Sequence, residues 1–393
     1  MRILIVLTYY RPHASGLTIY AERMAKALAK RGHQVTVMTS QYSKDLPLED
    51  VVEGVRVVRV PVAFRVSKGV VMPKFGRMAT QLVRENDVIQ LHLPQFDAAG
   101  IALRGRMWKK PTIISYHCDL QMPPGLLSQA ANLGIKLMNE LAARFAHRIV
   151  TNTRDYADNS PFLSRFLDKL TIIPPPVILP PATHERKAAF SQQHNPQERH
   201  PVIGMASRFA TEKGVEVLLD ALPGVLAVFP RAMVQFVGAY ENVVGEEAYF
   251  KRLSPRIHEF EQQGSWKFLG FIPDEDMAAF YGNLDVLVLP SLNSTESFGI
   301  VQIEAMINGV PTVASNLPGV RQPIAMHQMG ETFPVGDSAA LAERLVTILG
   351  NRAAYVRDPK PIEKMYLPDR IAAAYEEVFQ QIEQEIHPNH TQR

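Results

Sequence analysis

The chain has 393 residues, of which 46% are hydrophobic and 21% are charged, a balance typical of a soluble globular protein. This length exceeds what one ordinary hydrophobic core holds, so we expect two domains. Cys118 is the single cysteine, which excludes an intramolecular disulfide and a metal site built from several cysteines.

The net charge of +3 conceals an asymmetry between the two halves of the chain. Residues 1–180 carry 24 Lys and Arg against 13 Asp and Glu, a balance of +11, whereas the remaining residues carry 18 against 26, a balance of −8. A basic first half favours an anionic partner, with scattered solvated cations as the alternative. The first apolar run is too short for a secretory signal, and no run of about 18 apolar residues follows. We therefore predict a cytoplasmic protein, soluble or peripheral to a membrane.

The first half alternates predicted strands and helices. Ile3–Leu7 is a continuous apolar run, as in a strand that is covered on both faces. A loop containing Gly16 follows, then a helical pattern that ends at Gly32, and then a strand at Val35–Met38. This βαβ unit implies a parallel sheet. Further strands are predicted at Val55–Val60, Val88–His92, Thr112–Ser115, Arg148–Thr151 and Leu170–Ile173, with a helix around Gly134–His147.

A polar stretch with several prolines separates this half from a second run of the same kind. We predict a linker at residues 177–200, which follow Pro174–Pro176. The fold class is therefore α/β, with two doubly wound Rossmann-like domains at residues 1–178 and 200–362. A segment at residues 363–393 holds an amphipathic helix, which we expect to pack back on the first domain. The second run comprises strands at Val202–Ala206, Met233–Val237, Trp266–Leu269, Val286–Leu289 and Thr312–Ala314, and helices at Gly214–Leu226, Asp276–Tyr281, Gly299–Asn308 and Ser338–Leu349.

The loop after the first strand of the second domain carries two cations. Arg208 and Lys213 lie in this loop, and Gly214 allows a helix to begin directly after them. A guanidinium grips phosphate oxygens in a fork, and an ammonium adds a point charge. Ligands of open α/β sheets bind at the carboxyl ends of the strands, so the loop predicts an anion site. A solvated loop with a surface Glu212–Lys213 pair is the alternative.

A second charged segment, from Glu296 to Glu304, follows the strand Val286–Leu289. It opens a predicted helix near Gly299, and the free N–H groups at a helix start favour an anion. Two carboxylates eight positions apart flank that start, where each can bind hydroxyl groups. A sugar–diphosphate–ribose has this layout.

These motifs resemble those of the family 4 retaining glycosyltransferases, which have the GT-B fold. The resemblance implies two Rossmann-like domains facing a cleft, the first binding an acceptor and the second a nucleotide sugar. It implies transfer of a hexose or hexosamine from a UDP- or GDP-linked donor to an acceptor hydroxyl. The segments that carry it are Arg208…Lys213-Gly214, Glu296-Ser-Phe-Gly-x4-Glu304-Ala, Tyr116-His117-x-Asp119, Phe268-x-Gly270-Phe271 and Asn308-Gly-Val-Pro-Thr-Val-Ala314.

The resemblance also implies a role for each matching residue. Arg208 and Lys213 would neutralise the donor diphosphate, and Glu296 would hold hydroxyls of the donor sugar. His117 would reach the same sugar from the first domain, so these four form the catalytic group. The other implied donor contacts are Gly16 with phosphate, Phe271 and Ile272 with the base, Phe298, Gly299 and Ile300 with sugar and phosphate, and Glu304 with ribose; the implied acceptor contacts are Ser15, Gly16 and Asp119.

We expect neither a metal nor a cofactor besides the nucleotide-sugar co-substrate. The stretch Asp274-Glu275-Asp276 has the spacing of a metal-binding motif, but a predicted helix begins there. Acidic side chains at that position cap the helix and complement its dipole. The charge of the leaving group would be met by Arg208, Lys213 and helix dipoles instead.

The acceptor is expected at the basic first half. Two segments, Arg65–Arg77 and Arg104–Lys110, interleave Lys and Arg with aromatic and aliphatic residues. This pattern suits an anionic membrane surface, and ordinary helix flanks are the alternative. Our hypothesis is a peripheral enzyme at the inner face of the membrane that glycosylates a lipid or lipid-linked acceptor. A soluble small molecule or a polysaccharide is the alternative acceptor.

Other functional classes are open to different degrees. An NAD-dependent oxidoreductase needs a Gly-x-Gly-x-x-Gly turn after the first strand, and residues 7–16 lack it. A sugar-nucleotide epimerase shares the GT-B fold. A non-catalytic nucleotide-sugar-binding protein would need neither His117 nor Glu296. Nucleic-acid binding has only the charge of one half in its favour.

Overall fold

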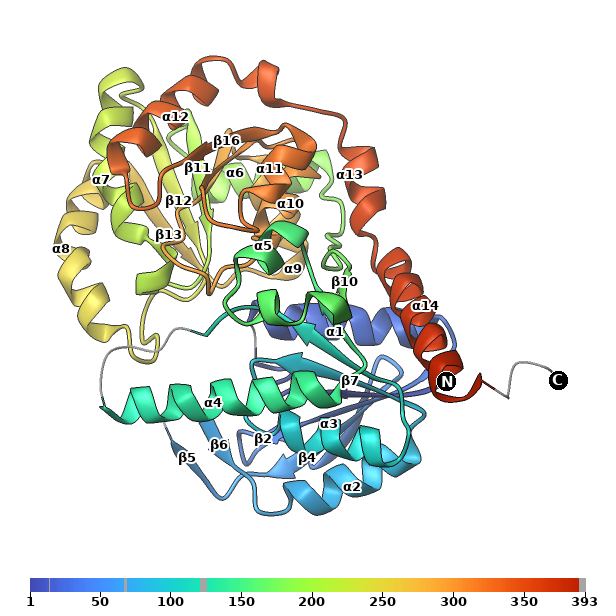
Figure 1. Cartoon of the computed structure of the whole chain (residues 1–393). Coiled ribbons are helices and arrows are strands. Elements are labelled where there is room, and N and C mark those ends of the chain that lie inside the picture. Colours follow the sequence, from blue (N-terminus) through green and yellow to red (C-terminus); the bar gives the residue numbers. More distant parts are fainter. Residues whose placement is uncertain (14, 67–68, 121–125, 389–393) are drawn as a thin grey trace. The chain divides into compact units, whose positions relative to one another are not determined.

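The computed structural model describes residues 1–13, 15–66, 69–120 and 126–388, and it divides into two compact units (Figure 1). Unit 1 comprises Met1–Pro176 and Tyr366–Arg393, and unit 2 comprises Val177–Met365. Each unit holds its own parallel sheet, so the predicted fold class of two Rossmann-like domains is confirmed. Ser67 and Lys68, in one of the predicted basic segments, lie outside the described residues.

Unit 1 is built on an eight-stranded sheet with the order β10-β9-β8-β7-β1-β2-β4-β3. All neighbouring strands are parallel except β3 and β4. The strands are β1 (Arg2–Val6), β2 (Gln34–Gln41), β3 (Glu49–Val52), β4 (Val55–Pro61), β7 (Val88–Leu93), β8 (Thr112–Tyr116), β9 (Arg148–Thr151) and β10 (Leu170–Ile172), and a separate hairpin pairs β5 (Phe64–Val66) with β6 (Gly69–Val71).

Helices cover both faces of this sheet. Leu4 and Val6 of β1 belong to one hydrophobic cluster, and Ile3 and Ile5 belong to another, because successive side chains of a strand point to opposite faces. The first cluster includes residues of α2 (Phe75–Glu85), α3 (Ala98–Met107), α4 (Leu126–Phe145) and α5 (Arg154–Asn159). The second includes residues of α1 (Gly16–Lys30) and α14 (Pro368–Ile386).

The C-terminal helix α14 packs on unit 1 beside α1, as predicted (Figure 1). Its Tyr375 is fully buried, and the Tyr375 hydroxyl lies 2.8 Å from the hydroxyl of Tyr20 in α1 and 2.8 Å from that of Ser115 in β8. At the helix surface, Arg31 forms an ion pair of 2.7 Å with Glu376. The last helix of the chain is therefore part of the core of unit 1.

Unit 2 contains a six-stranded parallel sheet with the order β13-β12-β11-β14-β15-β16. Strand order reverses at its first strand, β11, which pairs with β12 on one side and β14 on the other. The strands are β11 (Val202–Ala206), β12 (Met233–Val237), β13 (Trp266–Gly270), β14 (Val286–Leu289), β15 (Thr312–Ser315) and β16 (Gly330–Phe333), and the helices are α6 (His184–His194), α7 (Val215–Val228), α8 (Glu247–Gln262), α9 (Asp274–Gly282), α10 (Ile300–Met306), α11 (Gln322–His327), α12 (Ser338–Gly350) and α13 (Pro359–Tyr366).

The structure differs from the sequence prediction most clearly in the predicted linker. Residues 184–194 form helix α6, which belongs to unit 2 and packs against α9. Thr183 caps α6, because its side chain accepts a hydrogen bond from the N–H of Arg186. Phe190 is the one buried residue of this helix, so its sequence shows no amphipathic period.

Candidate functional site

Two charged loops of unit 2 meet where the order of its strands reverses. One follows β11 and holds Arg208 and Lys213, and the other follows β14 and holds Glu296. Because β11 and β14 are adjacent and parallel, both loops leave the same edge of the sheet. In open α/β sheets this switch point is where ligands bind. The fold thus brings together two segments that lie far apart in the sequence.

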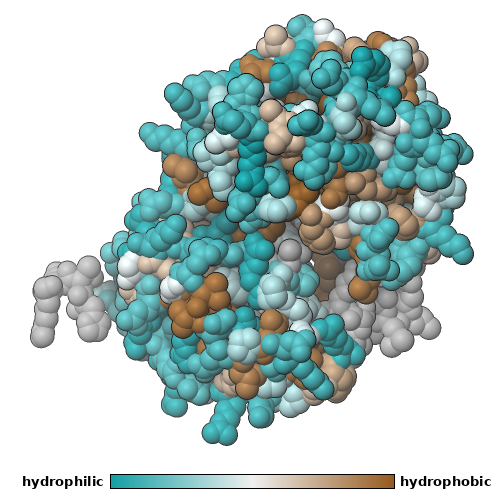
Figure 2. All heavy atoms as spheres, turned by 180° about the vertical axis from the view of Figure 1, so that it is seen from behind, coloured by the Kyte–Doolittle hydropathy of each residue, from teal (hydrophilic) through white to brown (hydrophobic). Residues whose placement is uncertain are grey.

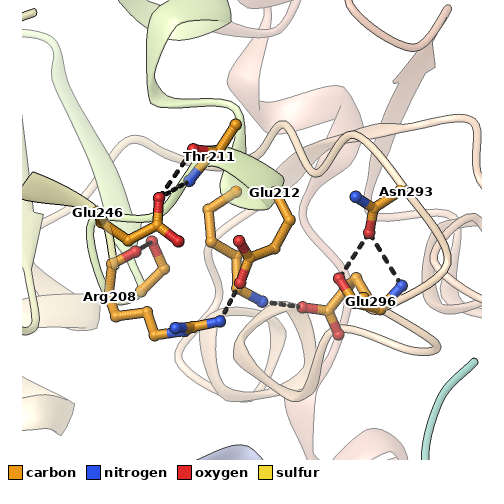
Figure 3. A network of polar contacts seen from close by, with 9 residues as sticks. Arg208, Thr211, Glu212, Glu246, Asn293 and Glu296 are labelled. Atoms are coloured by element: carbon orange, nitrogen blue, oxygen red, sulfur yellow. Dashed lines mark hydrogen bonds and ion pairs between the residues drawn. The ribbon is translucent and has the colours of Figure 1, made fainter. Parts of the chain in front are cut away.

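A buried side chain and several hydrogen bonds hold the loop after β11 in place. The side chain of Phe209 is fully buried, and its N–H donates to the carbonyl of Ala239. Residues Thr211–Lys213 form a 3-10 turn. Glu246, itself almost fully buried, accepts hydrogen bonds from both the N–H (2.9 Å) and the hydroxyl (2.8 Å) of Thr211, as Figure 3 shows. These contacts fix the backbone that carries Arg208 and Lys213.

Gly214 allows the two loops to touch. Its φ of +66° is a left-handed conformation that favours glycine. A Cβ atom at this position would overlap the carbonyl oxygen of Pro290, the residue that follows β14. The close approach is completed by a hydrogen bond of 2.9 Å from the N–H of Leu292 to the carbonyl of Glu212. Glycine is therefore required here by backbone conformation and by space together.

The approach of the loops joins Lys213 to Glu296. Lys213 Nζ lies 2.8 Å from Glu296 Oε2, and both side chains are largely buried. The other oxygen of Glu296 accepts the N–H of Gly299 at 3.0 Å, so the carboxylate also closes the turn that precedes α10. Gly299 has a φ of +80°, and a Cβ atom there would overlap Leu289. This pair links the two predicted anion-binding segments directly.

Arg208 pairs with a carboxylate that the sequence did not single out for it. Its guanidinium forms an ion pair with Glu212, four residues further on (Figure 3). The Arg208 side chain is 44% exposed and that of Glu212 is 17% exposed. The surface Glu212–Lys213 pair considered from the sequence is therefore wrong, because Glu212 meets Arg208 and Lys213 meets Glu296.

Glu304, the predicted ribose contact, is bound by a buried tyrosine. Its side chain is largely buried on α10, and Glu304 Oε2 accepts a hydrogen bond of 2.9 Å from the hydroxyl of Tyr281. Tyr281 is fully buried at the end of α9. Helix α10 is shorter than predicted and spans Ile300–Met306. The predicted ribose contact of Glu304 stays a prediction.

The other predicted donor residues occupy the same edge of unit 2. Phe271, just after β13, is 75% exposed, and Ile272 is half-buried. The side chain of Phe298 is buried, and the predicted backbone contacts of Phe298, Gly299 and Ile300 with the donor stay predictions. Two surface pockets of about 430 and 330 Å³ also lie in unit 2. They are lined by other residues, among them Tyr240, Phe250 and Glu241.

In unit 1, His117 follows β8 and pairs with a second histidine. His117 Nε2 lies 2.8 Å from Nδ1 of His92, which is in β7 and is buried. Burial lowers the pKa of His117 to about 4, and burial followed by the neighbouring His117 lowers the pKa of His92. Both rings are therefore neutral at physiological pH.

Asp119 has contacts that fix the loop after β8. Oδ1 accepts hydrogen bonds from Tyr116 (2.8 Å) and Ser160 (2.9 Å), and Oδ2 accepts one from Tyr156 (3.0 Å). Burial, followed by the charge of Asp119, raises the pKa of both tyrosines. The carboxylate thus ties β8 to α5, and its predicted acceptor contact stays a prediction.

Ser15 and Gly16 open helix α1. Ser15 is the N-cap, and its hydroxyl accepts the N–H of Thr18 at 3.2 Å. Among the described residues, nothing lies within 4 Å of the place where a Cβ atom of Gly16 would sit. The backbone at Gly16 is therefore approachable, whereas the Ser15 hydroxyl already serves as a cap. Contacts of either residue with a ligand stay predictions.

The acidic stretch Asp274–Asp276 forms the first turn of α9, where its charges complement the helix dipole. The side chains do not cap the helix as predicted, because Pro273 holds the N-cap position. Asp276 and Glu275 instead form ion pairs with Arg186 of α6. Among the described residues, no three His, Cys, Asp or Glu side chains cluster in a way that could hold a metal ion.

The contacts of three residues at these sites, Glu212, His92 and Glu246, were not predicted from the sequence. Glu212 stands four positions after Arg208, a spacing that favours an ion pair and could have been read from the sequence. His92 ends a predicted strand next to the strand that precedes His117, so the parallel order of the sheet would have found it. Glu246 lies in the loop between β12 and α8, and no local pattern marks its contact with Thr211.

Two family models match the chain, the "Glycosyl transferase 4-like domain" over residues 15–176 and "Glycosyl transferases group 1" over residues 186–361. The chain is 27% identical over 361 residues to phosphatidyl-myo-inositol mannosyltransferase of Mycobacterium leprae (strain TN), which covers 89% of this chain and 88% of that protein.

Among solved structures, the chain is similar to sucrose-phosphate synthase from Thermosynechococcus elongatus, with a TM-score of 0.76 at 19% identity over 97% of this chain and 98% of the other. It is also similar to Anabaena Alr3699/HepE in complex with UDP-glucose, with a TM-score of 0.72 at 21% identity over 99% and 100% of the two chains. At these identities the likeness concerns the fold.

Proposed function

Because the chain belongs to the family 4 glycosyltransferases of the GT-B fold, we propose that it transfers a hexose or hexosamine from a nucleoside-diphosphate sugar to an acceptor hydroxyl. The proposal includes retention of configuration at the anomeric carbon, a UDP- or GDP-linked donor and no metal requirement. The donor binds unit 2 at the loops after β11 and β14.

The observation that carries this proposal is that the loop of Arg208 and Lys213 meets the loop of Glu296 at the switch point of unit 2, where Lys213 pairs with Glu296. Two cations on a rigid loop can neutralise a diphosphate, and a guanidinium binds two phosphate oxygens at once. Glu296 and Glu304 supply carboxylates on the neighbouring loop and helix for sugar and ribose hydroxyls. Support for a nucleotide-sugar donor comes from Anabaena Alr3699/HepE, whose structure holds UDP-glucose.

The cations act on the charge that develops as the reaction proceeds. The bond between the anomeric carbon and the diphosphate oxygen breaks, and the sugar gains oxocarbenium character. The acceptor oxygen attacks the face that the diphosphate leaves, which retains the configuration, and its proton passes to a phosphate oxygen of the leaving group. Arg208 and Lys213 stabilise the departing nucleoside diphosphate, which is the site of growing negative charge.

For the acceptor we propose a lipid or lipid-linked hydroxyl at the cytoplasmic face of a membrane. The sequence relative from Mycobacterium leprae is named for phosphatidyl-myo-inositol. In unit 1, Met107 is 66% exposed between exposed Arg106 and Lys109, a combination that suits anionic lipid. Figure 2 shows apolar groups scattered over a mostly hydrophilic face. Among the described residues, no helix is long and apolar enough to cross a membrane.

Substitution of the two cations tests the proposed reaction. Lys213→Ala and Arg208→Ala should each lower kcat/KM at least tenfold, because each removes charge stabilisation from the transition state. Lys251→Ala is the matched control, since this exposed lysine of α8 lies outside the site. Activity of either site variant at the level of the control would refute the assignment.

Three further measurements test the donor, the reaction type and the membrane contact. A thermal-shift panel of UDP, GDP and ADP sugars identifies the donor, because a ligand that binds the folded state raises the melting temperature. Product analysis without acceptor separates transfer from epimerisation of the donor. Flotation with anionic and neutral liposomes tests the membrane contact, and equal, negligible binding to both would contradict it.

A further inference from the structure

The buried contact between His92 and His117 restricts where the protons on the two rings lie. Nδ1 of His92 and Nε2 of His117 are 2.8 Å apart, and the ring planes differ by 11°. A hydrogen bond at this distance needs one proton between the two nitrogens. Since burial lowers both pKa values, each neutral ring carries a single proton, and only two arrangements are possible.

The remaining nitrogen of His92 distinguishes the two arrangements. His92 Nε2 is buried and has no hydrogen-bond partner among the described residues. If His117 donates the shared proton, then His92 carries its own proton on Nε2, as a buried N–H without an acceptor. If His92 donates through Nδ1, then its Nε2 is only an unused lone pair. Orphaned N–H groups are rare in protein interiors and unused acceptors are less so, which favours donation by His92.

The donation by His92 also decides where the proton of His117 lies. When its Nε2 accepts the proton of His92, the single proton of His117 lies on Nδ1. Among the described residues, Nδ1 makes no hydrogen bond, and the side chain is only half-buried. The nitrogen that His117 turns to a ligand is then a hydrogen-bond donor without a basic lone pair.

We propose that His92 is a positioning residue that holds His117 as the Nδ1–H tautomer, so that His117 donates a hydrogen bond to an oxygen of the sugar and does not act as a base. The role at the sugar depends on the proposed function, whereas the tautomer does not. In this arrangement the acceptor proton cannot pass to His117, which agrees with its transfer to the leaving phosphate.

Tyr20 of α1 keeps the pair in place. Its ring meets the edge of His117 at a centroid distance of 4.9 Å and that of His92 at 5.9 Å, with interplanar angles of 85° and 74°. The Tyr20 hydroxyl is bound by Tyr375, so the ring cannot turn away. His117 is also tied through its N–H to the carbonyl of Leu93, at 3.0 Å. The two imidazoles are therefore fixed by packing as well as by their mutual bond.

Nuclear magnetic resonance of protein labelled with ¹⁵N at histidine tests the tautomer without any enzymatic assay. Long-range ¹H–¹⁵N correlations distinguish the two neutral tautomers and the charged ring. We expect Nδ1–H for both His117 and His92, with His92→Asn and His117→Asn spectra giving the assignments. His147 is an internal reference of opposite type, because its Nδ1 accepts the N–H of Thr112 at 3.1 Å. An Nε2–H pattern or a charged ring at His117 at neutral pH would overturn the proposal.

Two substitutions of His92 test its role in positioning. In His92→Asn the side-chain amide nitrogen lies near the position of Nδ1 and can still donate, whereas His92→Leu fills the space without a donor. We expect His92→Asn to keep kcat/KM within about threefold, and His92→Leu to lose about tenfold, because His117 then loses the hydrogen bond that fixes its tautomer. In His92→Leu the His117 signals should also move toward the Nε2–H tautomer. Equal kinetics and unchanged His117 signals in both variants would contradict positioning. If the protein transfers no sugar at all, the labelled spectra still decide the tautomer.

Discussion

Replacement of Gly214 by alanine tests whether contact between the two loops of unit 2 builds the donor site. The glycine has a φ of +66°, and an added Cβ atom would overlap the carbonyl oxygen of Pro290 and lie 3.1 Å from its carbonyl carbon. Both atoms belong to the backbone, so no side-chain rotation relieves the overlap. The loops must move apart, and that movement separates Lys213 Nζ from Glu296.

Gly336→Ala supplies the control from which the magnitude is worked out. Gly336 has a φ of +78°, and among the described residues nothing lies within 4 Å of its Cβ position. This variant should cost about 1 kcal/mol, the strain of a left-handed alanine. Gly214→Ala adds the overlap, typically about 1–3 kcal/mol in packed regions, for a total of about 2–4 kcal/mol. For a unit of this size, each kcal/mol lowers Tm by about 2–4 °C.

Thermal unfolding and nucleotide titration together give the answer. Gly336→Ala should bind the nucleotide found in the donor panel with unchanged Kd. Gly214→Ala should weaken that binding at least tenfold, because the displaced loop carries both cations. Equal Tm and equal Kd in the two variants would show that the contact between Gly214 and Pro290 does not shape the site.

Three further predictions concern pH, a helix end and metal. Burial lowers the pKa of His117 to about 4, so the unfolded chain binds more protons between pH 6.5 and 4. The contribution of His117 to the free energy of unfolding should be complete above about pH 6.5 and should fall by up to roughly 3 kcal/mol toward pH 4. As the pH is lowered, the urea midpoint should therefore fall less steeply in His117→Asn than in the unsubstituted protein. Lys169→Met should lower the free energy of unfolding in urea by about 1–3 kcal/mol, because Lys169 Nζ donates to three carbonyl groups at the end of α4. Lys30→Met, at an exposed lysine, is the control and should leave this free energy unchanged. Turnover should persist in EDTA, and an EDTA-sensitive rate restored by manganese would contradict the proposed charge neutralisation.

The strands of unit 2 could be predicted closely because their side chains are buried on both faces. Val202–Ala206, Met233–Val237 and Val286–Leu289 were predicted with the bounds that the structure shows, since a continuous apolar run between turn residues has few alternatives. Helix α6 could not be predicted, because only Phe190 is buried. The short edge strand β16 was missed for a similar reason, as Phe333 is its single buried residue.

The positions of the candidate site residues in the fold were predictable from the sequence, but their pairing was not. The loop positions of Arg208, Lys213 and Glu296 follow from strand ends and glycines, which the sequence displays. Which carboxylate meets which cation depends on the register of β11 against β14 and on the approach that Gly214 permits. Two residues separated by 83 positions, Lys213 and Glu296, come within 2.8 Å only once that tertiary contact exists.

The placement of α14 in unit 1 has a consequence for synthesis on the ribosome. The face of the first sheet that receives Tyr375 and Phe379 is made early, but the helix that completes it emerges only after all of unit 2. Until then, a nascent chain carries an incompletely sheltered apolar surface, which makes such intermediates prone to aggregation. Unit 2, by contrast, is a continuous segment that can fold while the chain is still attached to the ribosome. Chaperones should therefore be needed during translation mainly by the first part of unit 1.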